Sequence, residues 1–151
     1  QRQMCIRDRF GPVSISNDYT SMSRLLLIRF LKDSLFDNGL GRHVKPRHPY
    51  RSRRRLELFG SDNKMTLEEV SALIADIEED DKGVPVLIRQ YLKMGGRMLG
   101  FNIDPGFGDC VDGLIRVDLR QADPRVLSKY LGQEGARKFL AWHGQGQQQA
   151  G

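Results

Sequence analysis

The 151-residue sequence lacks the signatures of several protein classes. No run of 18 or more apolar residues occurs, so no membrane-spanning helix is predicted. The Gly-x-Ser-x-Gly motif of serine hydrolases and the spaced-glycine phosphate loops are also missing. His43, His48 and His143 do not have the spacing of metal ligands, so we expect no metal site. These absences leave a single globular domain, long enough to bury a core of its own.

Cysteine is scarce as well. Cys5 lies in the first nine residues, QRQMCIRDR, which show no periodicity and resemble the adapter-derived translation found at the ends of metagenomic reading frames. We therefore exclude residues 1–9 from reasoning about the fold and expect the protein to continue upstream. Cys110 then stands alone, which excludes an intrachain disulfide and a cysteine metal cluster. A reducing, cytoplasmic setting is the default expectation.

The stretch from Gly83 to Leu119 carries the clearest secondary-structure signal. Apolar residues recur at three- and four-residue spacing from Val84 to Leu92, and Gly95-Gly96 then ends the predicted helix. Alternating apolar and polar residues predict strands over 98–103 and 113–119, joined by a Pro/Gly turn. A helix followed by two strands predicts an α/β domain (α+β, with a mixed sheet) and excludes a helical bundle.

Periodicity and capping signals predict one further strand, Phe10–Ser16, and four further helices. These helices are expected over 21–32, from the Thr66/Glu69 capping box onward, from Asp123 to Tyr130 and over 135–143, with Gly132 as the break between the last two. The domain is therefore expected to span residues 10–143. The low-complexity tail, 144–151, is expected to be disordered.

Residues 42–55, RHVKPRHPYRSRRR, form a basic segment without a single acidic residue. Its two prolines exclude a continuous helix, so an exposed loop is predicted. A dense positive charge attracts anionic lipid head groups, an acidic carrier protein or nucleic acid, although it can also be a merely solvated loop. Nucleic acid is the weakest of these, because only Tyr50 is available for base stacking. The candidate carrier-protein or headgroup ligands are Arg47, Arg51, Arg53, Arg54 and Arg55.

A few other residues are candidates for chemistry. Asp104 belongs to a group of acids around the two C-terminal strands and could act as a general base, although loop acids in solvent are commoner. Tyr91 lies on the apolar face of the predicted helix, where a tyrosine is more often packed in the core than catalytic. Tyr19, beside Asn17 at a strand-to-helix turn, is better placed for function. Taken alone, these residues do not name a reaction.

Long blocks of the sequence are more specific: FGPVSISNDY, SRLLL, VPVLIRQYLKMGGRMLGFNIDPGFGDCVDGLIRVDLRQADPRVLSKYLG and ARKFLAWH. They closely resemble the C-terminal half of the hemolysin-like GNAT acyltransferases, a family similar to the ornithine-lipid N-acyltransferases. In many bacterial members such a domain is fused behind a glycerolipid acyltransferase domain. The resemblance implies an incomplete GNAT-like fold, in which FGPVSIS is the fifth strand, the one that splays from the fourth to admit the acyl thioester.

The resemblance also implies roles for particular residues. Tyr19 and Tyr91 are the candidate catalytic residues, and Asn17, Arg89 and Asp104 are the candidate ligands of the substrate or acyl donor. Two motifs are missing: the Arg/Gln-x-x-Gly-x-Gly/Ala pyrophosphate loop of GNAT enzymes and the His-x-x-x-x-Asp motif of glycerolipid acyltransferases. Both are expected upstream, so this chain is expected to be inactive alone.

The function expected from the resemblance is the transfer of a fatty acyl group from acyl carrier protein, or from acyl-CoA, to an amine such as that of ornithine. Neither donor would be a resident cofactor. The expected partners are the carrier protein, an anionic membrane surface and an amine-bearing lipid precursor, and the expected location is cytoplasmic, peripheral to the inner membrane. The alternative is a non-catalytic, membrane-docking half of a bifunctional lysophospholipid acyltransferase.

Overall fold

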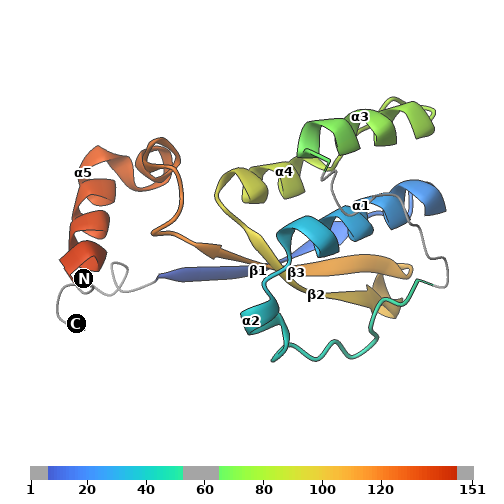
Figure 1. Ribbon diagram of the computed structural model, residues 1–151, viewed down its shortest axis with the longest axis horizontal. Helices are drawn as coiled ribbons and strands as arrows, with labels where there is room; N and C mark the ends of the chain where they lie inside the picture. Colours follow the sequence, from blue (N-terminus) through green and yellow to red (C-terminus); the bar gives the residue numbers. More distant parts are fainter. Residues whose placement is uncertain (1–6, 53–64, 146–151) are drawn as a thin grey trace.

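A three-stranded antiparallel sheet forms the centre of the structure, a computed structural model that describes residues 7–52 and 65–145 (Figure 1). The strands are β1 (Asp8–Ile15), β2 (Arg97–Asp104) and β3 (Cys110–Asp118), in the order β1-β3-β2. The prediction of a mixed helix-and-strand fold is confirmed. The first strand begins at Asp8, so it includes the last two residues of the segment that was excluded from the sequence reasoning.

The β2–β3 connection is a tight hairpin that the sequence specifies locally. A single 3-10 turn, η2 (Pro105–Phe107), follows β2, and the Asp104 carboxylate accepts a hydrogen bond from Gly106 N at 2.9 Å. Gly108 then adopts a left-handed conformation, with φ of 64°, which glycine tolerates without steric cost. The turn returns the chain antiparallel to β2, and the other side of β3 pairs with β1, so β3 is the central strand.

Three helices cover one face of the sheet and bury the main core against it (Figure 1). They are α1 (Ser21–Leu35), α3 (Leu67–Ile77) and α4 (Val86–Lys93). The fully buried side chains at their centre come from both helices and strands: Leu26, Leu27, Ile28, Leu31, Ile74, Ile88, Met98 and Ile115. The predicted capping box at Thr66 and Glu69 is present at the start of α3. The short helix α2 (Asn38–Gly41) follows α1.

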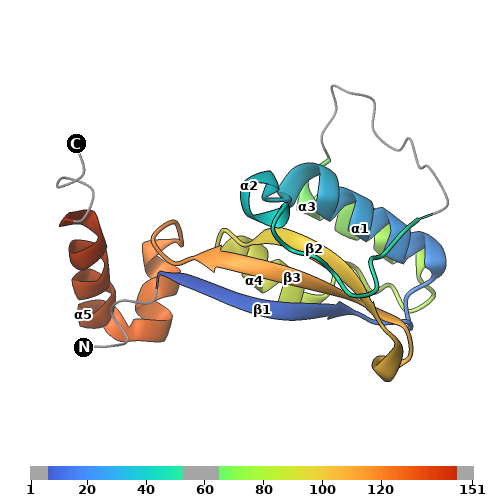
Figure 2. The same cartoon turned by 90° about the horizontal axis from the view of Figure 1, so that it is seen from below.

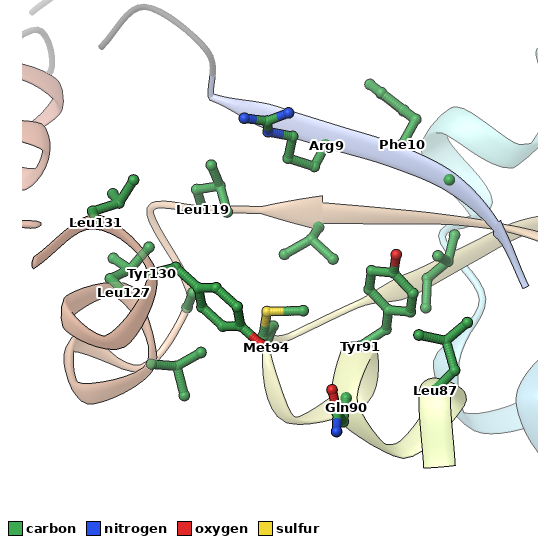
Figure 3. A pocket seen from close by; sticks show the side chains of 15 residues that line it. Arg9, Phe10, Leu87, Gln90, Tyr91, Met94, Leu119, Leu127, Tyr130 and Leu131 are labelled. Carbon is green, nitrogen blue, oxygen red and sulfur yellow. The ribbon is translucent and has the colours of Figure 1, made fainter. Parts of the chain in front are cut away.

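Helix α5 (Pro124–Gln145) lies at the end of the sheet remote from α1 (Figure 1). It consists of two helical segments, because Gly132 has a φ of 73° and interrupts the helix, as predicted. The two segments enclose a small core of their own, formed by Ala122, Leu127, Ala136 and Phe139. Side chains of β1, β3, α4 and α5 line a cavity between these elements, which is described below (Figure 3).

Candidate functional site

The outer edge of β2 is covered by other parts of the chain (Figure 2). Tyr50 N donates a hydrogen bond to Phe101 O at 3.2 Å, and Ile103 N donates one to His48 O at 2.7 Å. Nearer the start of the strand, Asp37 N donates to Met98 O at 2.9 Å. The basic segment, predicted as a loop, is therefore tied to the sheet by its backbone over residues 48–50.

Within residues 7–52 and 65–145, the outer edge of β1 is open. One side of the strand pairs with β3 along its whole length, from Asp8 opposite Asp118 to Ile15 opposite Val111, and no described segment pairs with the other side (Figure 2). Pro12 is compatible with this position, because a proline cannot donate to a second neighbour and is confined to edge strands. An uncovered edge presents a row of backbone donors and acceptors to an incoming chain or ligand.

A cavity of about 480 Å³ lies beside this edge, over the gap between α4 and α5 (Figure 3). We call it the end cavity, because it lies at the end of the sheet where β1 begins. Its walls are mainly apolar and come from β1, β3, α4 and α5; they include Phe10, Gly11, Leu87, Tyr91, Leu127 and Tyr130.

Glycines lie at the β1 wall of the end cavity and at the end of α4. Gly11 faces it from β1 without a side chain, so a hypothetical Cβ there would lie 3.7 Å from the Tyr91 hydroxyl oxygen. Gly95 and Gly96 end α4, as predicted, with Gly95 in the left-handed conformation. A Cβ on Gly96 would lie only 2.6 Å from Tyr91 O. Gly95 and Gly96 thus let the chain turn sharply from α4 back into β2.

Tyr91 contacts both the main core and the end cavity. Its half-buried ring packs against the main core, and its hydroxyl points toward β1 (Figure 3). Within the part of the chain that the structure describes, the hydroxyl makes no hydrogen bond. The hydroxyl is therefore available to a ligand in the cavity.

Tyr19 and Arg89 meet on the other side of α4, where both line a second depression of about 500 Å³. The Tyr19 hydroxyl donates to Gly83 O at 2.8 Å, while Arg89 donates to Val84 O at 3.1 Å and to Ser71 Oγ. Burial raises the pKa of Tyr19, and the nearby Lys82 charge opposes this effect without cancelling it. Both side chains thus hold the turn that leads into α4.

Asn17 and Asp104 lie at the opposite end of the sheet from the end cavity. The Asn17 amide donates to Gly108 O and accepts from Arg24, which fixes the β1–α1 turn against the β2–β3 turn. Asp104 caps η2, as described above. The five candidates for catalysis and substrate binding therefore occupy three separate places, and only Tyr91 lines the end cavity.

Glu78 is a buried carboxylate that is not among the residues predicted from the sequence. It begins the run of four acidic residues 78–81, and such a run is typical of an exposed surface. It accepts hydrogen bonds from Thr20 N and Thr20 Oγ1, both at 2.9 Å, and forms an ion pair with Lys82 at 3.5 Å. Burial alone would raise the pKa of this carboxyl, but hydrogen bonds from Ser23 and Thr20 and the charge of Lys82 outweigh it and lower the pKa to about 2. Glu78 therefore joins the end of α3 to the beginning of α1.

The basic segment presents a row of exposed cations. Lys45, Arg47 and Arg51 are exposed, whereas the Tyr50 ring is half-buried, with Lys32 Nζ 5.4 Å from its centroid. The other three arginines that the sequence analysis proposed, residues 53–55, lie outside the described residues. The fixed backbone of residues 48–50 holds these exposed charges beside β2.

Comparison with known proteins identifies no relative: no protein-family model, curated protein or solved structure matches the chain. Within residues 7–52 and 65–145, no group of three or more His, Cys, Asp or Glu side chains could hold a metal ion. No helix in those ranges combines the length and the apolar character needed to cross a bilayer.

Proposed function

We propose that this chain forms the C-terminal part of an N-acyltransferase that moves a fatty acyl group from acyl carrier protein, or from acyl-CoA, to an amine such as that of ornithine. The open edge of β1 is the observation that carries the proposal. The resemblance assigns FGPVSIS to the strand that parts from its neighbour to admit the acyl thioester, and such a strand must have one side free of backbone pairing. β1 meets this requirement, whereas the opposite edge of the sheet is covered.

The position of Tyr91 supports a role in the reaction. In the proposed step the neutral amine attacks the thioester carbonyl, a C–N bond forms and the C–S bond breaks. The departing thiolate takes the Tyr91 hydroxyl proton, and the proton lost by the amine returns to the phenolate. Tyr91 is the better donor of the two candidate tyrosines, because the Tyr19 proton is already held by Gly83 O. The remaining rate enhancement would come from positioning and from stabilisation of the oxyanion.

The test is an acyl-transfer assay on the complete reading frame that carries this chain, with acyl carrier protein as donor and ornithine as acceptor. We expect acyl-ornithine, detected by mass spectrometry, and a loss of about 10²-fold in kcat for Tyr91→Phe. Tyr130→Phe is the matched control, because this tyrosine lines the same cavity from α5. Absence of product from the complete frame, or equal activity of Tyr91→Phe and the control, would contradict the proposal.

A second candidate function, docking of a non-catalytic half on an anionic membrane, is favoured by the exposed cations of the basic segment. Arg47 and Arg51 lie on either side of the backbone that is fixed to β2, so their charges are held at the surface rather than on a free loop. Sedimentation with anionic liposomes tests it. The double substitution Arg47→Gln/Arg51→Gln should reduce binding, whereas neutralising Arg125 and Lys129 on α5 should not. Loss of binding with unchanged acyl transfer would favour docking as the role of the segment.

A further inference from the structure

We propose that Arg24 and Tyr50 form a binding site for a phosphate group, in which the Arg24 guanidinium binds the phosphate oxygens and the Tyr50 hydroxyl donates to one of them. Arg24 lies in the first turn of α1 and Tyr50 in the basic segment, at the end of the sheet where β1 leads into α1 (Figure 2). Neither residue has a role in the proposed acyl transfer, so phosphate binding and acyl transfer can be tested separately.

Arg24 occupies a helix position that would ordinarily hold an apolar side chain. Residues three, four and seven positions further along α1 lie on the same face of the helix. These are Leu27, Ile28 and Leu31, and each is at most 1% exposed in the main core. Arg24 therefore begins the buried face of α1, although its side chain keeps partial exposure to solvent. A charge in such a position is costly unless an opposite charge or several hydrogen-bond acceptors compensate it.

The described residues supply little of that compensation. Arg24 forms no ion pair with any of them, and the Asn17 amide oxygen is its one hydrogen-bond acceptor among them. Its Nε atom is the one buried side-chain nitrogen or oxygen in residues 7–52 and 65–145 that has no hydrogen-bond partner. Arg116, another partly buried arginine, pairs with three carboxylates. We attribute the missing counter-charge of Arg24 to a bound anion.

The Tyr50 hydroxyl is a second donor without a partner. Its ring is half-buried, and the hydroxyl makes no hydrogen bond in the part of the chain that the structure describes. Burial raises the pKa of this hydroxyl, and the charge of Arg24 opposes that shift, which places the guanidinium near it. No described carboxylate perturbs the pKa of Tyr50. Beside this hydroxyl, an anion bound to Arg24 would therefore meet a donor and no carboxylate.

The charge around Tyr50 favours phosphate over a carboxylate ligand. Lys32, about two turns beyond Arg24 on α1, has its Nζ 5.4 Å from the centroid of the Tyr50 ring and forms no ion pair with a described residue. Two cations without a carboxylate partner suit a dianion better than a monoanion. The planar guanidinium also presents its N–H donors as a fork that matches two phosphate oxygens at once.

Calorimetric titration of the chain with inorganic phosphate at constant ionic strength tests the site. We expect saturable binding of one phosphate, and acetate, a monoanion, should bind at least about tenfold more weakly. Arg24→Gln should weaken phosphate binding at least about tenfold, because a charged hydrogen-bond donor is lost. Arg29→Gln is the matched control, because it removes the same charge from the exposed face of α1, where Arg29 pairs with Asp33, and it should leave the affinity unchanged. Equal weakening by the two substitutions would overturn the site.

A purely structural role for Arg24 predicts a different result in thermal denaturation. If the chain itself satisfied the guanidinium, Arg24→Met would lower the melting temperature with and without phosphate. We expect instead that Arg24→Met is at least as stable as wild type in phosphate-free buffer, and that added phosphate stabilises wild type alone. A phosphate-free melting temperature of Arg24→Met well below that of wild type would overturn the proposal.

Tyr50→Phe tests the second donor without disturbing the packing, because it keeps the ring. It should weaken phosphate binding about threefold or more and leave the phosphate-free melting temperature unchanged. An affinity equal to that of wild type would overturn the role of the hydroxyl.

Sedimentation with phosphatidate vesicles distinguishes the two sources of such a phosphate group. Vesicle binding that inorganic phosphate displaces and that Arg24→Gln abolishes would assign the site to a lipid head group. Phosphate binding together with vesicle binding that is insensitive to Arg24→Gln would assign it to a soluble phosphate. Absence of any Arg24-dependent binding in both assays would overturn the proposal.

Discussion

Replacing Glu78 by glutamine should destabilise the protein in a pH-dependent way. The pKa of about 2, against the ordinary 4.5, corresponds to at most about 3.4 kcal/mol of stabilisation of the folded state. Lys82 is partly exposed, so solvent screening reduces this value, and we expect about 1–2 kcal/mol. Because the folded-state pKa is the lower one, the stabilisation is complete above about pH 4.5 and is lost as the pH falls toward 2.

Urea denaturation from pH 7 to pH 3 measures this effect as the difference in unfolding free energy between wild type and Glu78→Gln. The difference should be constant above pH 5 and should shrink steadily below it. Glu79→Gln is the matched control, because it changes the neighbouring carboxylate on an exposed side chain, and it should stay within about 0.5 kcal/mol of wild type. A Glu78→Gln deficit that does not change with pH would refute the assignment of the effect to the ionised carboxylate.

Two further substitutions test the ion pairs of β3 and the close contact at the end of α4. Arg116→Leu removes one of the two arginines that pair with the buried Asp118. Thermal denaturation should show that the unfolding free energy falls by about 2–4 kcal/mol. A decrease below about 0.5 kcal/mol would contradict a stabilising role of the ion pairs. Gly96→Ala forces a Cβ to within 2.6 Å of Tyr91 O and should cost about 1–3 kcal/mol. Gly144→Ala meets no such contact and should be neutral in the same assay.

The features that the sequence predicted correctly depend on neighbouring residues. The end of α4 at Gly95-Gly96, the capping box at Thr66 and the break at Gly132 each follow from a residue's own backbone preference or from one side chain three positions away. Periodicity also placed Tyr91 correctly on the apolar face of its helix.

The features that the sequence did not predict depend on which segments meet in space. The pairing of residues 48–50 with β2 uses backbone groups, which leave no signature in side-chain identity. The burial of Glu78 requires the N-terminus of α1, 58 residues away along the chain. The end cavity lies between four elements that are far apart in the sequence, so no short motif indicates it. The sequence also did not reveal that the candidate site residues lie in different parts of the fold, because this too depends on tertiary packing.

We propose that the free side of β1 belongs to an acyl-handling cleft that another part of the same polypeptide completes. Amide hydrogen exchange of residues 8–15, resolved by NMR, tests it most directly. In this chain alone the β1 amides that point away from β3 should exchange rapidly, and in the complete reading frame they should gain protection that increases further with a bound acyl thioester. Identical exchange of these amides in the chain, the complete protein and its acyl complex would contradict the claim.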